Sequence, residues 1–503
     1  MLFTNLCGRI EILIKKPKVS SVWPILWLAL LGVVMGMALM GPTAGSCRAF
    51  TVILFCLALW AVMFARLEYA AAAAVLCIPV HNYLTTSILL GEQAPTGINV
   101  GTVWTGLMLL VFLARYRIMP LDIRERKLLY IYLTLTGFMV LAYLRGTEVG
   151  LSEWLLIFSG LARVFCIVIW LRHAALVLPW TRSRWACTAL GIGPIIVGCS
   201  MFGNVARAVT ASSGQLFAMA RNSGLDNPSD SADAAVMALL FLCGSSVLVG
   251  KRMKLGLLLL PAAFIVPLLS GSRSGFFAAI VGVAVLLYGR HNALLLAGAL
   301  ALGGAFSALK GFAPFLYDRF TQLETGPGSG RGSGLLEVRS EVFVNAWSAF
   351  LQHPFLGSGK DIYWKFSQTQ EAAHNTLLGF LAEGGILYGL VFLFFVWNLL
   401  VLTSVCDRRW PVAGRAGMAI VAAFFVGSCA LLYSCIDYNF MLLAGYVGYL
   451  LGGLRRSSVT AICSDPRIHC APLRNQAVVG GKVTSQMRAK MRSILPILVI
   501  ALG

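Results

Sequence analysis

Apolar runs long enough to cross a membrane recur along the chain and limit what it can fold into. A helix that crosses a bilayer needs about 20 consecutive apolar residues, and the sequence holds about 14 such runs, or about 12 if short neighbours merge. With 58% hydrophobic and 12% charged residues, the chain has too few polar side chains for one soluble core. We therefore predict an all-α, polytopic transmembrane helix bundle of about 12–14 helices. The candidate spans cover roughly residues 21–41, 48–65, 69–90, 98–114, 128–144, 152–171, 185–203, 234–250, 255–270, 275–289, 292–309, 375–402, 416–435 and 438–454.

Lysine and arginine fall in alternate loops, although the net charge of +20 alone could indicate nucleic-acid binding. Cytoplasmic loops of membrane proteins carry an excess of basic residues. The pattern therefore predicts both termini in the cytoplasm, two long outward loops at 204–233 and 310–374, and no nucleic-acid partner. The basic clusters include Lys15/Lys16/Lys18, Arg115/Arg117/Arg124/Arg126/Lys127, Arg172/Arg182/Arg184, Lys251/Arg252/Lys254, Arg408/Arg409/Arg415 and Arg455/Arg456.

The distribution of polar residues predicts three regions. Residues 1–203 are N-terminal transmembrane helices, and 204–454 hold both long loops and the polar residues of functional interest. Residues 455–503 form a basic cytoplasmic tail that can rest on anionic membrane lipid. The 13 cysteines are scattered through apolar segments and the tail without metal-ligand spacing, which favours small core residues over a metal site.

His374 and Asn375 stand where the second long loop gives way to an apolar run, in AAHNTLLGFLAEGGILYGL at 372–390. Histidine changes its charge near neutral pH, and at a water–lipid boundary it can reach both a lipid-linked group and a soluble one. We therefore predict chemistry at the membrane surface, with Asn375 orienting the imidazole. Glu383 follows about 180° around the helix from His374, so we expect it to be a buried partner of another polar group.

Two arginines on the outward side are candidates for binding an anion. Arg273 lies in GSRSG, where small residues let the backbone turn and leave amide groups able to face an anion. Its forked guanidinium suits phosphate oxygens, although an interfacial arginine can also extend to lipid headgroups. Arg221 lies in the first long loop, where it either binds the same anion or serves solubility alone.

Residues 335–352 predict a helix inside the second long loop. Glu337, Glu341, Asn345, Ser348 and Gln352 form a polar stripe, and apolar residues that include Val342, Phe343 and Ala346 cover the other side. Arg339 stands roughly 200° from Glu337, near the centre of the apolar face. It either belongs to the wall of an active site or lies on an in-plane helix and binds any lipid phosphate.

The motifs, taken in order, resemble those of the O-antigen ligase and exopolysaccharide polymerase superfamily. SRSG at 272–275, R-x-E-x5-W at 339–347, HP-x-LG-x-G at 353–359 and HN-x-L-x5-E-x-G-x3-G at 374–389 carry the resemblance, which covers about residues 200–450. It implies a metal-independent, inverting glycosyltransferase without a cofactor. Such an enzyme takes a glycan from an undecaprenyl diphosphate carrier at the periplasmic face of a bacterial inner membrane and passes it to a glycan or lipid acceptor.

By this resemblance His374 is the essential histidine, Arg273 binds the pyrophosphate, and Arg221 matches the arginine of the preceding loop. That loop reads DNPSDS where the family has a Pro-Asn pair, which weakens the match of Arg221. Three functions stay open. A ligase transfers the glycan to an anchor such as lipid A core, and a polymerase transfers it to a second lipid-linked repeat. A flippase or transporter instead predicts polar residues reaching the membrane from both sides, whereas these candidates lie on one side.

Overall fold

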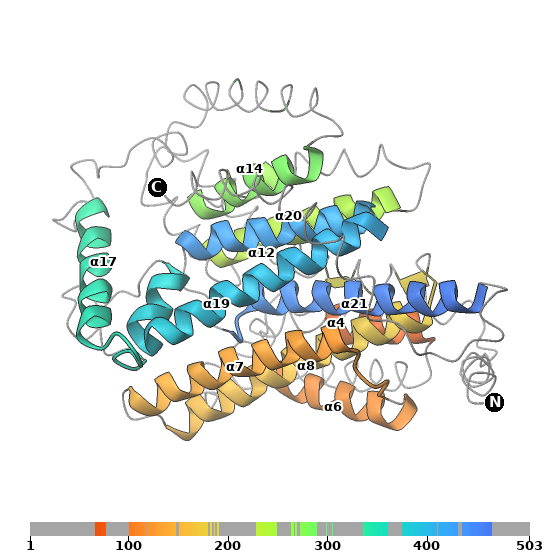
Figure 1. The fold of residues 1–503 in the computed structure, drawn as a ribbon, viewed down its shortest axis with the longest axis horizontal. Helices are drawn as coiled ribbons and strands as arrows, with labels where there is room; N and C mark the ends of the chain where they lie inside the picture. The colour runs from red at the N-terminus through yellow and green to blue at the C-terminus, as the bar shows by residue number, and fades with distance from the viewer. Residues whose placement is uncertain are drawn as a thin grey trace, which may run out of the picture.

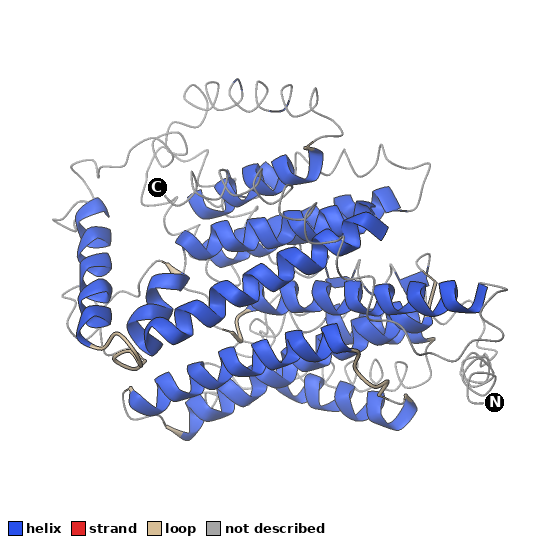
Figure 2. Ribbon diagram, in the orientation of Figure 1, coloured by secondary structure: helices blue, strands red, loops and turns tan. Residues whose placement is uncertain are grey.

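The computed structural model is a bundle of α-helices (Figures 1 and 2). Among the residues described there is no strand, which confirms the predicted all-α membrane bundle. The structure describes residues 66–76, 100–116, 118–146, 150–179, 182–183, 186, 189–190, 228–248, 263–265, 267–268, 272–288, 298, 304, 335–360, 375–409, 411–430 and 435–464. Their helices are α4 (Leu67–Leu76), α6 (Val100–Arg115), α7 (Ile123–Arg145), α8 (Leu151–Val177), α12 (Pro228–Leu248), α14 (Arg273–Leu287), α17 (Leu335–Gln352), α19 (Thr376–Arg409), α20 (Pro411–Ala430) and α21 (Tyr438–Ser464).

Three helical stretches within the described residues are long and apolar enough to cross a membrane: Ile123–Arg145, Ile157–Val177 and Thr376–Arg408. Shorter apolar helices occur in α6, α12, α14 and α20. The predicted spans 21–41 and 48–65 lie outside the described residues, as do most of 185–203, 255–270 and 292–309. The total of 12–14 helices and the three sequence regions therefore stay predictions.

Glycines allow α21 to pack closely along α8. A Cβ atom at Gly448 would lie 3.0 Å from the backbone oxygen of Val168, and one at Gly445 would lie 2.5 Å from the Ile167 side chain. Gly452 meets the backbone of Arg172 in the same way. Residue numbers increase together along the contact, so α8 and α21 run parallel. Small residues at such an interface let two membrane helices approach without side chains between them.

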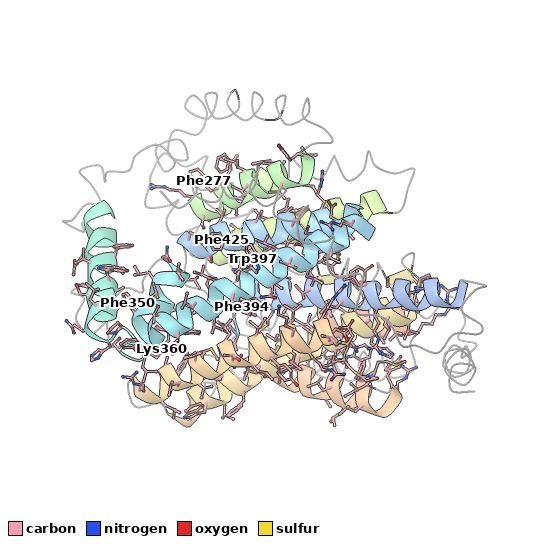
Figure 3. The ribbon with its side chains drawn as sticks, in the orientation of Figure 1. Phe277, Phe350, Lys360, Phe394, Trp397 and Phe425 are labelled. Carbon is pink, nitrogen blue, oxygen red and sulfur yellow. The ribbon has the colours of Figure 1, made fainter. Side chains whose placement is uncertain are left out.

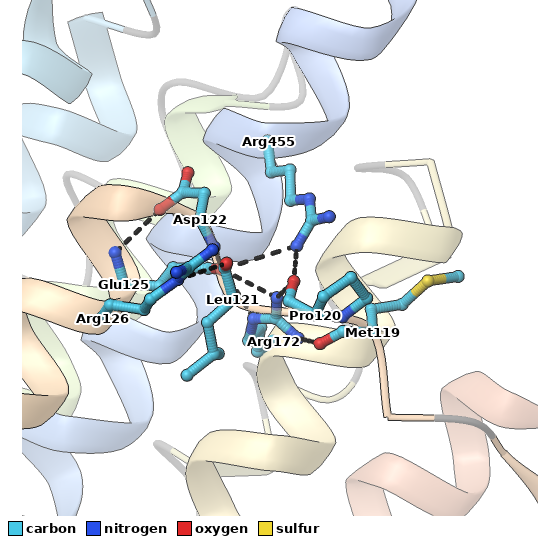
Figure 4. A network of polar contacts seen from close by, with 8 residues as sticks. All are labelled: Met119, Pro120, Leu121, Asp122, Glu125, Arg126, Arg172 and Arg455. Atoms are coloured by element: carbon cyan, nitrogen blue, oxygen red, sulfur yellow. Dashed lines mark hydrogen bonds and ion pairs between the residues drawn. The ribbon is translucent and has the colours of Figure 1, made fainter. Parts of the chain in front are cut away.

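A buried ion network joins α7, α8 and α21 at one end of the bundle (Figure 4). The guanidinium of Arg172 donates to the Glu125 carboxylate at 2.6 and 2.8 Å, and also to the carbonyls of Met119 and Pro120. Arg455 lies 3.5 Å from the same carboxylate. Asp122 caps α7 by accepting a hydrogen bond from the Glu125 amide, and Glu125 accepts one in return from the Asp122 amide. This capping box fixes the carboxylate that both arginines contact.

Candidate functional site

The SRSG motif forms the start of α14 and fastens it to α12. Ser272 caps the helix by accepting a hydrogen bond from the Gly275 amide at 3.2 Å. The Ser274 hydroxyl donates to the buried Asp233 carboxylate of α12 at 3.2 Å. A Cβ at position 275 would lie 3.0 Å from both Ala232 and Asp233, so glycine allows the close approach. Arg273 is the first residue of α14 and is partly exposed. These contacts therefore fix the position of its backbone.

Asn375 caps the start of α19 and fastens it to a neighbouring helix. Its side-chain oxygen accepts a hydrogen bond from the Leu378 amide at 2.9 Å, which is the geometry of a helix N-cap. Its side-chain nitrogen donates to the carbonyl of Cys429, near the end of α20, at 3.2 Å. Asn375 therefore fixes where α19 begins and ties that point to α20. The imidazole that we expected Asn375 to orient belongs to His374, which lies outside the described residues.

The helix register puts Arg273 and Asn375 at the same end of the bundle. Helices α14 and α20 run antiparallel, because Arg415 near the start of α20 donates to the carbonyl of Tyr288 at the end of α14. A Cβ at Gly282 would lie 3.4 Å from the Ala419 carbonyl, which sets the register. At about 1.5 Å per residue, Arg273 lies about 14 Å from this crossing and Cys429 lies about 15 Å from it in the same direction. The starts of α14 and α19 thus share one level.

Helix α19 is broken at Gly385, so that its first segment, 376–384, folds against the rest (Figure 1). Gly385 has φ +75° and ψ −172°, which is accessible to glycine but strained for other residues. The rings of Phe380 and Tyr388 stack across the break with their centroids 4.1 Å apart. The first segment of α19 is therefore a separate short helix that presents Asn375 at its beginning.

The HP-x-LG-x-G motif forms a loop that is hydrogen-bonded to this break. The amides of Ser358 and Gly359 donate to the carbonyls of Ala382 and Glu383 at 2.8 and 3.0 Å, and the Ile386 amide donates to the Pro354 carbonyl at 2.7 Å. Gly357 and Gly359 have positive φ, and a Cβ at Gly357 would overlap the backbone of Glu383. The contact between the HP-x-LG-x-G loop and the break in α19 therefore requires glycine.

Polar side chains fasten the same loop to α7 and α19. Figure 3 labels Lys360 near the broken end of α19. The Lys360 ammonium lies 3.1 Å from the Glu383 carboxylate, and the Glu383 side chain is 6% exposed. The Lys360 amide donates to the Ala142 carbonyl at 2.8 Å, and Arg145 donates to the Leu356 carbonyl at 2.6 Å. The expectation that Glu383 is a buried partner of another polar group is confirmed. Sequence reasoning missed Lys360 and Arg145, although a basic residue beside GSG on the outward side was a usable signal.

Helix α17 has the predicted bounds and packs on the first segment of α19. Val342, Ala346 and Ala349 form a buried cluster with Leu378 and Ala382. The end of α17 leads into the loop at the Gly385 break, and residues earlier in α17 lie toward the start of α19. Arg339 lies about one turn before Val342 in α17, toward the start of α19.

The structure thus places the starts of α14 and α19, with Arg273 and Asn375, at one level of the bundle. It packs α17, the helix that carries Arg339, on the first segment of α19. The side chain of Arg339 lies outside the described residues, and so do His374 and Arg221. In the sequence His374 directly precedes Asn375. The catalytic role of His374 and Arg273 and the substrate-binding role of Arg221, Arg339 and Asn375 remain predictions.

A family model described as O-antigen ligase matches residues 256–394, a range that holds α14, α17, the 353–360 loop and the first segment of α19. No curated protein matches the chain. The matched range includes Arg273, Arg339, His374 and Asn375, and Arg221 lies outside it. The chain is a multi-pass membrane protein whose residues 256–394 are similar to O-antigen ligases.

Proposed function

We propose that this protein transfers a glycan from an undecaprenyl diphosphate carrier to an acceptor hydroxyl at the periplasmic face of the bacterial inner membrane. One observation carries the proposal: within the O-antigen ligase region, the starts of α14 and α19 lie at one level of the bundle. Arg273 and the residue that follows His374 occupy those two positions. An anion-binding group and a proton acceptor at one membrane surface are what a lipid-diphosphate donor requires.

The distribution of charge supports the assignment of sides. The network of Arg172, Glu125 and Arg455 and the pair of Arg415 and Asp407 lie at the end of the bundle opposite Arg273. Basic residues gather on the cytoplasmic side of membrane proteins. The end that carries Arg273 is then the periplasmic one, and both termini are cytoplasmic.

In the proposed reaction, an oxygen of the acceptor hydroxyl attacks C1 of the sugar from the side opposite the diphosphate. The bond from C1 to the diphosphate oxygen breaks, and undecaprenyl diphosphate leaves with the electron pair. His374 takes the proton of the acceptor hydroxyl, a role that contributes typically 10²–10⁴-fold to a rate. No metal ion is needed if guanidinium groups stabilise the leaving diphosphate.

Arg273 binds the diphosphate and stabilises the charge that grows on it as the C1–O bond breaks. Removing one such preorganised donor lowers kcat by about 10²–10³-fold in enzymes where it has been measured. Arg221 and Arg339 supply further positive charge to the same group. Asn375 acts through its bonds to Leu378 and Cys429, which hold the start of α19 and so the position of His374.

The test uses a deletion strain complemented with His374→Ala, Arg273→Ala or Arg273→Lys, and measures the lipid-linked glycan that accumulates. Each variant should insert normally and accumulate donor, with Arg273→Lys losing less because it keeps the charge but not the fork. Arg408→Ala is the matched control, because this exposed arginine lies at the opposite end. Single repeats would indicate lost polymerisation and full-length chains lost ligation. Normal glycan product from His374→Ala would refute the proposal.

A further inference from the structure

Helix α17 has three faces instead of the two that we expected. Its buried face is formed by Val342, Ala346 and Ala349. At about 100° per residue, a second face lies roughly 100–200° from Val342 and is apolar, yet it is exposed. Its members are Phe343, Val344, Trp347 and Leu351, with exposures of 53%, 57%, 42% and 60%.

The third face of α17 is polar and lies roughly 240–300° from Val342. It carries Glu341, Asn345, Ser348 and Gln352, of which Ser348 and Gln352 are exposed. The helix therefore meets protein on one side, an apolar surrounding on the second and a polar one on the third. A helix lying in the plane of a membrane interface has this arrangement. Figure 1 agrees, because α17 runs across the end of the bundle, crosswise to the long helices.

A loop with exposed apolar side chains links the exposed apolar face of α17 to α19. The loop after α17 exposes Phe355 and Leu356, and the Pro354 carbonyl of this loop is hydrogen-bonded to the Ile386 amide. From that point α19 exposes Ile386, Leu387, Leu390, Phe394 and Trp397 along a stretch long enough to cross the membrane. Apolar side chains exposed on such a helix face acyl chains. Exposed apolar side chains thus occur on the span, on the loop that is hydrogen-bonded to it and on α17.

We infer that the face formed by Phe343, Val344, Trp347, Leu351, Phe355 and Leu356 is embedded among phospholipid acyl chains in the leaflet at this end of the bundle. The polar face of α17 then lies toward the headgroups and water. Because α17 packs on the first segment of α19, the leaflet supports the helix that presents Asn375. This inference does not depend on the transfer reaction.

The first measurement uses the unmodified protein, one copy per lipid nanodisc, with a phospholipid that carries a diazirine in its acyl chain. After illumination, peptide mass spectrometry should find lipid adducts on residues 343–356 as well as on 386–397. Adducts on 386–397 alone would overturn the inference, because α17 would then lie outside the acyl region. Adducts on 343–356 only after a polyprenyl diphosphate is added would also overturn it, since the occupant would then be the polyprenyl chain.

The second measurement compares Trp347→Cys with the matched control Ser348→Cys, neighbours on the apolar and polar faces. Both positions are exposed, so neither change disturbs the packing on α19. A membrane-impermeant maleimide reacts with the thiolate, which is disfavoured in an apolar surrounding. We expect modification at 347 to be on the order of tenfold slower than at 348. Equal rates at the two positions would contradict the inference.

Discussion

The break at Gly385 is the point where the two family motifs touch, and Gly385→Ala tests whether that contact holds the site together. The φ of +75° with ψ of −172° is a conformation that a residue with a Cβ rarely adopts. The new methyl group would also lie 2.6 Å from the Leu356 nitrogen and would overlap the Phe355 carbonyl. The loop must therefore shift away from the break.

The size of the effect follows from these two terms. Holding a residue in such a conformation costs about 1–3 kcal/mol. Displacing the loop weakens bonds such as that from the Ile386 amide to the Pro354 carbonyl, each worth about 0.5–1.5 kcal/mol. With one bond lost, we expect Gly385→Ala to lower the free energy of unfolding by about 1.5–4.5 kcal/mol. Transfer activity should fall with it, because the first segment of α19 loses its anchor.

The assay is denaturant unfolding in mixed micelles, followed by circular dichroism and compared with transfer activity in membranes. Gly137→Ala is the matched control, because Gly137 lies inside α7 and its Cβ would meet open space. That change should leave stability unchanged or raise it by up to about 1 kcal/mol, since alanine favours helix. If Gly385→Ala were as stable and as active as Gly137→Ala, the structural role of the break would be refuted.

Two further predictions concern the ends of the bundle. Glu125→Ala should lower the free energy of unfolding by about 3–5 kcal/mol, because it leaves the buried Arg172 guanidinium without its carboxylate, and adding Arg172→Met should restore part of the loss. A loss below about 1 kcal/mol in the same unfolding assay would indicate an ordinary surface pair. Asn375→Ala should cost about 0.5–2 kcal/mol through the lost N-cap. Asn375→Asp should cost less, because it keeps the acceptor for the Leu378 amide and loses only the donor to Cys429. Equal losses for the two Asn375 variants would contradict the capping role.

The sequence predicted those elements that hydropathy and periodicity encode. The spans at 128–144 and 152–171 correspond to α7 and α8, and the helix at 335–352 has the bounds of α17. The start of α14 was predictable as a polar break, because Ser and Gly residues separate two apolar segments there. The hydrogen bonds of its amides were not predicted. We expected the amides to face an anion, but the Gly275 amide donates to the Ser272 hydroxyl.

Features that depend on distant partners were not predictable. Residues 375–402 read as one continuous apolar span, because hydropathy does not register a break at Gly385 whose cause is the loop at 353–360. The apolar side of α17 was predicted as one face that included Phe343, since periodicity cannot tell which apolar residues meet α19 and which meet lipid. Asn375 was assigned to the imidazole on sequence proximity, and its bond to the Cys429 carbonyl was not predictable because it depends on where α20 ends.

The central claim is that the lipid diphosphate binds at the end of the bundle where α14 and α19 begin. The direct measurement is photo-crosslinking with a polyprenyl diphosphate that carries a photoreactive group next to the diphosphate, in membranes, with mapping by peptide mass spectrometry. We expect crosslinks in the peptides that hold Arg273 and residues 374–378. Crosslinks confined to the opposite end, beside Arg172 and Arg455, would contradict the claim.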